Sequence, residues 1–297
     1  MTAAIAPAPS KSSQAILPAA TAIGAVTLRV ADAQRSLRWY RDMLGLELIE
    51  QSPERLVLGA GGQPFLDLEV RPGATPRDEN TTGLYHVAIL VPDRPSLGGV
   101  LARIAAAGVR LGASDHLVSE ALYIWDEDNN GLEIYRDRPR NEWKWEGREV
   151  RMATDPLDLR NLGQAGVAAG KEREPMPAGT RIGHVHLQVG DIAKAGAFYC
   201  DVLGFEKTAG RHGALFVSAG RYHHHIGMNI WHSRNAPPPA ANAAGLMIFE
   251  IVVPDRAALA SAKARLEAAG VKTEKDGDGL RFRDPWRTAV RLIPAPS

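Results

Sequence analysis

An internal repeat is the feature that most constrains the fold of this chain. The segment GAVTLRVADAQRSLRWYRDMLGLE, which begins at Gly24, recurs as GHVHLQVGDIAKAGAFYCDVLGFE from Gly183, with matching Gly, Val, Leu, Asp and Tyr residues at equal spacing. A second pair of segments, GLYHVAILVPDRPSLGGVLARIAAAGV and GLMIFEIVVPDRAALASAKARLEAAGV, begins at Gly83 and Gly245. Because a repeated sequence folds into repeated units of structure, the chain consists of two related halves, each with two units.

Within each unit the hydrophobic pattern changes from strand to helix and back. In the first unit, alternating apolar residues such as Val26 and Leu28 are typical of a strand. An aspartate then marks the start of a helix, Leu37 and Tyr40 lie on one helical face, and Gly45 ends the helix. Short β-type runs follow in every unit. We therefore predict an α+β fold of four β-α-β-β-β modules, over residues 24–72, 83–138, 183–233 and 245–294.

The modules also divide the chain along its length. We expect an N-terminal arm over residues 1–20, a first domain over 21–138, a linker over 139–180 and a second domain over 181–297. The linker lacks the repeat and is rich in charge, so we expect it to wrap the surface between the halves. Its early tryptophans, Trp143 and Trp145, are expected to anchor it by burial.

The composition excludes several classes of function. Lysine and arginine number 35 against 34 aspartates and glutamates, so no basic surplus exists to neutralise a nucleic acid. The single cysteine, Cys200, rules out an intrachain disulfide and a thiolate metal cluster. No apolar run approaches the ~18 residues of a membrane span, and the proline-broken residues 1–20 are unlike a secretory signal. We expect a cytoplasmic protein with no nucleic-acid or membrane partner, and leave open whether it forms a homo-oligomer.

Four modules in this order resemble the vicinal oxygen chelate superfamily, which includes glyoxalase I, bleomycin-resistance proteins and extradiol ring-cleavage dioxygenases. The resemblance covers nearly all of residues 22–294 except the linker. It implies two domains of curved mixed sheets, in which paired modules curl into a cup. It also implies that metal ligands lie on the first and last strands of a module, where inward side chains converge on one point.

The outer modules lack ligands at these positions. The first module has Ala25 where the first-strand ligand would lie, and the fourth has Ile248 and Arg291 at its two positions. Neither module can hold a metal in the manner of the family.

The central modules carry the ligand types that the resemblance implies. The second module has His86 in its first strand and Glu133 in its last, and the third has His184 in its first strand. His186 shares the face of His184 and competes with it, but the alignment to the family motif favours His184. Two histidines and one carboxylate are the ligand set of non-haem Fe(II) oxygenases.

This ligand set has a consequence for the architecture. In the familiar two-domain extradiol enzymes the ligands come from the third and fourth modules. Here the second and third modules share them, so we infer that these central modules, one from each half, pair into the metal cup. The first and fourth modules would then form a metal-free cup. The alternative is that each half closes on itself, in which case the three ligands never meet.

A run of three histidines precedes the strand IGMNIW in the third module. The resemblance implies an acid/base histidine here, and we assign that role to His224, with His223 as the neighbouring alternative. We place His223 and His225 on the substrate side of the site. An imidazole suits proton transfer because its unperturbed pKa is about 6.5. The competing interpretation is a surface tract that binds metal without catalysing anything.

Two further residues are matched to the family pattern. Tyr123 lies ten positions before Glu133, where extradiol enzymes place a tyrosine beside the substrate. We expect its hydroxyl to donate a hydrogen bond to a ring oxygen or to the bound peroxo intermediate. The competing interpretation is an ordinary strand tyrosine. His116 lies in the preceding loop, and we expect it to bind substrate or to support the site from behind.

The resemblance thus implies an extradiol dioxygenase that cleaves a small aromatic diol, with O2 as co-substrate and a ring-opened semialdehyde as product. Fe(II) is the expected metal, Mn(II) accepts the same ligands, and no organic cofactor is expected. Two rivals remain. One is a glyoxalase-like isomerase or lyase, which usually needs a fourth protein ligand. The other is a non-catalytic binder of small molecules, like the bleomycin-resistance proteins.

Overall fold

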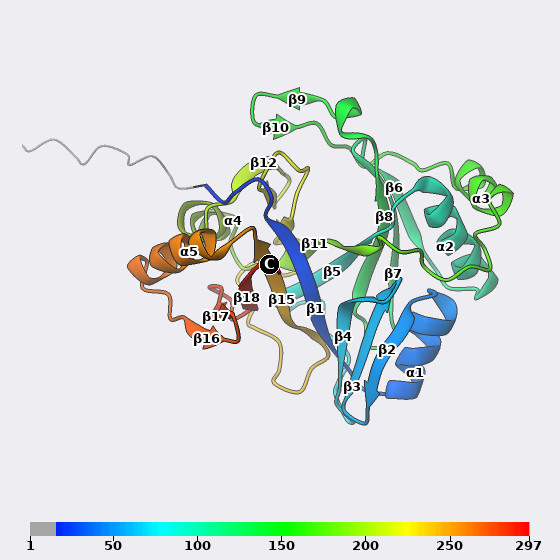
Figure 1. Cartoon of the computed structure of the whole chain (residues 1–297), viewed down its shortest axis with the longest axis horizontal. Helices are drawn as coiled ribbons and strands as arrows, with labels where there is room; N and C mark the ends of the chain where they lie inside the picture. Colours follow the sequence, from blue (N-terminus) through cyan, green and yellow to red (C-terminus); the bar gives the residue numbers. More distant parts are fainter. Residues whose placement is uncertain (1–15, 297) are drawn as a thin grey trace, which may run out of the picture.

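The computed structural model describes residues 16–296 and contains two eight-stranded mixed sheets (Figure 1). Most of the predicted arm, residues 1–15, lies outside the described residues. The α+β architecture with repeated modules is confirmed. Each sheet takes strands from both halves of the chain, so the sheets do not follow the division into residues 21–138 and 181–297.

The first sheet, here called the outer-module sheet, joins modules one and four in the order β16-β17-β18-β15-β1-β4-β3-β2. Its centre is the antiparallel pair of β1 and β15, the first strands of the two modules. The strands are β1 (Ala22–Val30), β2 (Glu47–Ser52), β3 (Arg55–Ala60), β4 (Gln63–Val70), β15 (Gly245–Val253), β16 (Glu274–Asp276), β17 (Gly279–Arg283) and β18 (Ala289–Pro294).

The second sheet, here called the central-module sheet, joins modules two and three in the order β12-β13-β14-β11-β5-β8-β7-β6. Strands β5 and β11 pair antiparallel at its centre, and each pairs in parallel with the last strand of its own module. The pairing of the central modules across the two halves is therefore as predicted. The strands are β5 (Gly83–Leu90), β6 (Gly112–Asp115), β7 (Ser119–Trp125), β8 (Gly131–Asp137), β11 (Arg181–Gln188), β12 (Glu206–Arg211), β13 (Ala214–Ser218) and β14 (Ile226–Asn229).

An aspartate begins the helix of every module, as predicted. Each accepts a hydrogen bond from the backbone N–H three residues later, as Asp32 does from Arg35 at 2.7 Å, which satisfies a donor at the helix end. In modules one and three the helix continues as a π-helical turn. The segments are α1 (Ala33–Leu37) with η1 (Arg38–Met43), α2 (Arg94–Ala106), α4 (Ile192–Gly196) with η3 (Ala197–Val202), and α5 (Arg256–Ala268).

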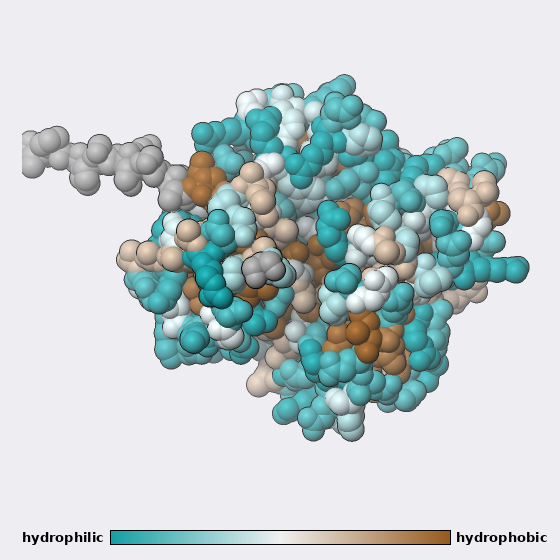
Figure 2. All heavy atoms as spheres, in the orientation of Figure 1, coloured by the Kyte–Doolittle hydropathy of each residue, from teal (hydrophilic) through white to brown (hydrophobic). Residues whose placement is uncertain are grey.

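The π-helical turns carry tyrosines that join the two sheets. Tyr40 in η1 donates to Asp126 before β8 at 2.8 Å, and Tyr199 in η3 donates to Asp284 before β18 at 3.0 Å. Each bond therefore links a module of one sheet to a module of the other. One continuous apolar core, with residues from all four modules, supports these links. Outside the core, hydrophilic residues cover most of the face seen in Figure 2.

The linker is ordered and packs on the central-module sheet. It contains η2 (Arg140–Glu142), a short hairpin of β9 (Trp145–Glu146) and β10 (Glu149–Val150), and α3 (Leu159–Ala168). Trp143 is buried as expected, in a cluster with Val118 and Tyr222, whereas Trp145 is half-buried against the same cluster. No helix within residues 16–296 is both long and apolar enough to cross a membrane.

Gly166 of α3 and Gly98 of α2 allow the backbones of the two helices to touch. A Cβ on Gly166 would lie 2.3 Å from the carbonyl carbon of Gly98, whereas a Cβ on Gly163 would meet its nearest neighbour, Leu101, at 3.8 Å. The close approach of the linker helix thus depends on Gly166.

We predict that Gly166→Ala lowers the free energy of unfolding by about 1–3 kcal/mol, because the added methyl overpacks a backbone contact. Gly163→Ala on the same helix is the matched control and should raise stability by about 0.5–1 kcal/mol through helix propensity. Urea unfolding measures both variants. Equal effects of the two substitutions would contradict the proposed contact.

Candidate metal centre and its pocket

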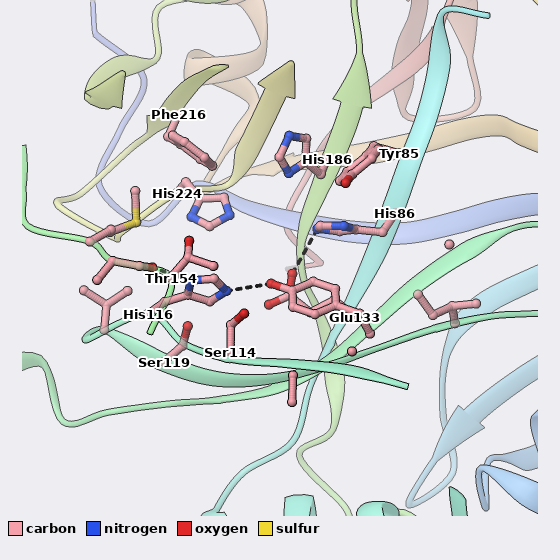
Figure 3. A pocket seen from close by; sticks show the side chains of 18 of the residues that line it. Tyr85, His86, Ser114, His116, Ser119, Glu133, Thr154, His186, Phe216 and His224 are labelled. Atoms are coloured by element: carbon pink, nitrogen blue, oxygen red, sulfur yellow. Dashed lines mark hydrogen bonds and ion pairs between the residues drawn. The ribbon is translucent and has the colours of Figure 1, made fainter. Parts of the chain in front are cut away.

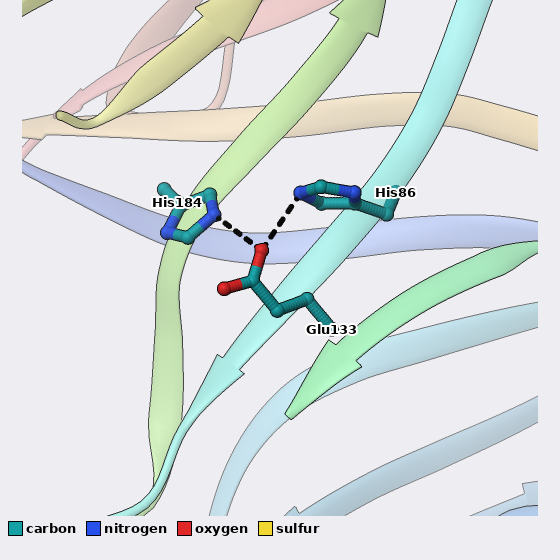
Figure 4. Close-up of side chains that lie close together, drawn as sticks. All are labelled: His86, Glu133 and His184. Carbon is teal, nitrogen blue, oxygen red and sulfur yellow. Dashed lines mark hydrogen bonds and ion pairs between the residues drawn. The ribbon is translucent and has the colours of Figure 1, made fainter. Parts of the chain in front are cut away.

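The three predicted ligands come together on adjacent strands of the central-module sheet. His86 lies on β5, Glu133 on β8 and His184 on β11, with one ligand atom of each within 4.8 Å of the others. The Nε2 atoms of His86 and His184 lie 2.9 Å and 3.1 Å from the same atom, Oε2 of Glu133 (Figure 4). Two imidazoles therefore converge on one carboxylate oxygen.

Two irregularities in the pairing of β5 with β11 orient the histidines. Ile182 pairs with Ile89 and His184 with Ala88, so Gly183 is an extra residue in β11. Likewise His186 pairs with His86 and Leu187 with Leu84, so Tyr85 is an extra residue in β5. Such bulges re-aim the neighbouring side chains. A bulge thus lies immediately before each of the two candidate ligand histidines.

Gly183 also makes room for a tyrosine behind the site. A Cβ at this position would lie 1.8 Å from Oη of Tyr135, which is fully buried and packs on the ring of His184 with 4.8 Å between centroids. Any side chain at position 183 would displace either the tyrosine or the strand that carries His184. The repeated glycine therefore helps to set the position of His184.

Burial and mutual attraction set the charge states of the ligands. Burial raises the pKa of Glu133, but the neighbouring His184 and His86 outweigh it and hold that pKa well below its usual range. Burial lowers the pKa of His184 to about 4, despite the attraction of Glu133. Near neutral pH the site thus presents a carboxylate anion and a neutral His184 imidazole, the protonation states that a metal requires.

The site fits a divalent cation. Nε2 of His86 is buried and makes no hydrogen bond of acceptable geometry, although it lies at ion-pair distance from Glu133. A buried polar atom without a partner is unfavourable, and a cation between the three side chains would supply that partner. Two nitrogens and one oxygen on one side of an ion suit Fe(II) or Mn(II) and leave coordination positions open.

A cavity of about 450 Å³ opens next to the ligands (Figure 3). His86 and Glu133 line it directly, whereas His184 packs against the lining residue His224, with 4.0 Å between ring centroids. The rest of the wall is largely apolar, and two half-exposed tryptophans, Trp125 and Trp231, also line it. Apolar wall residues include Val118, Ile124, Leu132, Met152 and Phe216.

The three consecutive histidines, His223 to His225, lie in different surroundings. His224 lines the cavity, and burial holds its pKa well below the usual value. His223 is fully buried, and its Nε2 lies 2.8 Å from the Asp137 carboxylate. His225 accepts a hydrogen bond from the backbone N–H of Ala219 at 3.2 Å, and burial lowers its pKa to about 3. The structure thus brings one of the three predicted residues to the cavity and places the other two behind it.

Tyr123 and His116 form a hydrogen-bonded pair in the cavity wall. Nδ1 of His116 lies 2.6 Å from the carbonyl oxygen of Ala153, and Nε2 lies 2.6 Å from Oη of Tyr123. Because the carbonyl can only accept, Nδ1 of His116 carries the hydrogen. In neutral His116, Nε2 then accepts from the Tyr123 hydroxyl. The linker thus orients His116, which in turn orients Tyr123.

Several lining residues were not predicted, or were predicted only as competitors. His186 lines the cavity, and its Nε2 accepts from Asn229 at 3.0 Å; the shared strand face with His184 was the signal for it. Tyr85 enters the wall because of the bulge in β5. Met152 and Thr154 come from the linker, and no pattern in the sequence indicates their place.

We predict that Gly183→Ala lowers metal content and thermal stability, because the new methyl collides with the Tyr135 hydroxyl. The double substitution Gly183→Ala/Tyr135→Phe removes the atom at 1.8 Å and should recover part of both losses. Metal analysis and thermal unfolding provide the measurements. A single variant that retains full metal content would show that Gly183 has no part in ligand geometry.

Comparisons with known proteins identify the family of this chain. The sequence profile of the Glyoxalase/Bleomycin resistance protein/Dioxygenase superfamily matches residues 22–134 and 181–291. The chain is 44% identical over 272 residues to Catechol-2,3-dioxygenase of Bacillus subtilis (strain 168), which covers 89% of this chain and 94% of that protein.

Solved structures share the fold at low sequence identity. A protein of Bacillus subtilis subsp. subtilis str. 168 superposes with a TM-score of 0.64 at 15% identity, over 95% of this chain and 87% of that one. Glyoxalase I from Zea mays gives a TM-score of 0.55 at 16% identity, over 93% and 92% of the two chains. With four repeated modules, a site on paired central modules and a relative of 44% identity, the chain belongs to the glyoxalase, bleomycin-resistance protein and dioxygenase superfamily.

Proposed function

We propose that this chain is an extradiol dioxygenase that opens the ring of a catechol-type substrate at an Fe(II) ion held by His86, Glu133 and His184. The observation that carries the proposal is the convergence of two imidazole nitrogens on one carboxylate oxygen beside a cavity of about 450 Å³. The 44% identical relative named as a catechol-2,3-dioxygenase supports the choice of reaction. The product is a ring-opened semialdehyde, with O2 as co-substrate.

The metal would supply a redox centre and a Lewis acid with open positions for substrate and dioxygen, and Mn(II) accepts the same three ligands. The chain's own residues supply binding and proton transfer. The apolar wall packs against the aromatic ring and excludes water, which strengthens the electrostatic interactions inside. Tyr123 and His116 direct the catechol hydroxyls from one side of the cavity, and His224 faces them from another.

His224 is suited to accept a proton from the catechol. Burial holds its pKa well below the usual value, so the imidazole is neutral near neutral pH and has a free lone pair. A catechol hydroxyl transfers its proton to this nitrogen as the substrate binds as an anion. The imidazolium then returns the proton to the reacting oxygen as the ring opens.

The structure gives a reason to prefer this reaction to glyoxalase chemistry. In the parallel pair of β5 and β8, Glu133 lies opposite Ala88; in the matching pair of β11 and β14, Gly227 lies opposite His186. Where a fourth ligand would be expected, the chain therefore has a glycine. A Cβ there would lie 2.9 Å from Nδ1 of His186, so the glycine makes room for that ring.

The direct test is turnover. Protein purified without oxygen and loaded with Fe(II) should consume O2 with catechols and produce the near-visible absorbance of a ring-cleaved semialdehyde. The panel should include catechols with apolar substituents, which the wall of the cavity can accommodate. No O2 uptake with any catechol would overturn the proposal. Metal-free binding of the same compounds would point instead to a sequestering protein.

The ligand assignment has a matched control in the other sheet. We predict that Glu133→Gln abolishes stoichiometric iron binding and turnover, because it removes the only anion among the three ligands. Glu250→Gln on β15 alters a carboxylate that pairs with Arg291 at 2.8 Å in the outer-module sheet, and should leave both unchanged. If Glu133→Gln retained its iron, Glu133 would not be a ligand and the proposed site would be wrong.

We predict that His224→Ala lowers kcat by about 10²–10⁴, the usual contribution of a general acid/base, with iron content unchanged. Steady-state O2 uptake measures the loss, and metal analysis serves as the control. An unchanged kcat would remove His224 from the mechanism.

Location in the cytoplasm and assembly into a homo-oligomer stay predictions.

A further inference from the structure

A line of hydrogen bonds runs from the end of β8 to the cavity through the wall behind His224. The carboxylate of Asp137 lies 2.8 Å from Nε2 of His223. Nδ1 of His223 lies 2.8 Å from Nδ1 of His224. The second carboxylate oxygen accepts a hydrogen bond from Tyr222 at 2.9 Å, which holds Asp137 in place. Asp137 belongs to module two and both histidines to module three, so the line exists because these modules pair.

The chemistry of the groups gives this line a direction. A carboxylate can only accept, so Nε2 of His223 carries a hydrogen. A neutral His223 then has its lone pair on Nδ1, which can only accept from Nδ1 of His224. A neutral His224 with its hydrogen on Nδ1 has its lone pair on Nε2, the nitrogen left for the cavity. The same logic governs the aspartate that selects the histidine tautomer in serine proteases.

The packing around His223 keeps this arrangement rigid. The His223 side chain is fully buried between the rings of Tyr222 and Trp143, with centroids at 4.1 Å and 5.2 Å. Tyr135 on β8 completes the surroundings, since its hydroxyl lies 2.8 Å from that of Tyr222. A buried ring held on all sides cannot turn over easily to exchange its two nitrogens.

We infer that Asp137, acting through His223, is a positioning residue that sets the tautomer of His224 and leaves its Nε2 free to accept the catechol proton. This inference rests on the proposed function. In the step itself the catechol O–H bond breaks and an Nε2–H bond forms on His224. The resulting imidazolium still donates its Nδ1–H to His223, and the Asp137 carboxylate at the end of the line offsets the new positive charge.

The kinetic test replaces the carboxylate in the iron-loaded protein. Asp137→Asn can present an amide donor to His223, and Asp137→Ala removes the acceptor altogether. Both should lower kcat by about 100-fold or more, while iron content and anaerobic catechol affinity stay as in the wild type. The matched control is Asp284→Asn, a buried carboxylate bonded to Tyr199 in the outer-module sheet, which should lower thermal stability without lowering kcat.

A double-mutant cycle separates positioning from general damage. If Asp137 acts through His224, Asp137→Asn should cause no further loss in a His224→Ala background. Losses that multiply would overturn the inference, as would wild-type turnover in Asp137→Asn or Asp137→Ala. Loss of iron in these variants would also overturn it, because it would show a structural role in the metal site.

A second readout does not depend on turnover. In Zn(II)-loaded protein labelled with ¹⁵N-histidine, nitrogen chemical shifts should show His224 with its hydrogen on Nδ1, and Asp137→Asn should shift the hydrogen toward Nε2. A wild-type His224 with its hydrogen on Nε2 would overturn the inference. If the wild-type protein opens no catechol, the proposed function fails, and the tautomer measurement still decides whether Asp137 controls His224.

Discussion

The antiparallel pairing of β5 with β11 is the interaction on which the rest of the site depends. It joins the two halves of the chain and places β5 of module two between β8, the last strand of the same module, and β11, the first strand of module three. Without it, His86 and Glu133 would lie on one sheet and His184 on another. The two extra residues in this pair, Gly183 and Tyr85, then aim the neighbouring histidines at the same carboxylate oxygen.

Equivalent positions on the first and last strands of the modules carry different side chains in the two sheets. In the central-module sheet these positions carry the candidate metal ligands His86, Glu133 and His184, all of which are buried. In the outer-module sheet Arg291 occupies the place of Glu133, and it forms an ion pair with Glu250, which also accepts from the backbone of Ala25. Paired opposite charges close that region without a metal, whereas the ligand cluster leaves Nε2 of His86 without a hydrogen bond.

Sequence patterns predicted the parts of this protein that repeat or follow a local rule. The aspartate caps and the succession of strand and helix along each module depend on neighbouring residues, and the structure confirms them. The three candidate ligands follow from the family resemblance and from their residue types, and the structure brings them within 4.8 Å of one another. Other parts of the cavity wall are not indicated by the sequence, since Met152 and Thr154 belong to a linker without a repeat, and Tyr85 enters the wall because of a bulge that alternation alone does not predict.

By itself the sequence determined the four modules, the family and the residue types available for chemistry, because these are properties of local pattern and of residue identity. Only the tertiary structure decided which histidine of the run from His223 to His225 reaches the cavity. That outcome depends on partners far along the chain, such as Asp137 beside His223 and Ala219 beside His225. Neighbours in sequence differ in role here because each is held by a hydrogen bond to a different, unrepeated partner.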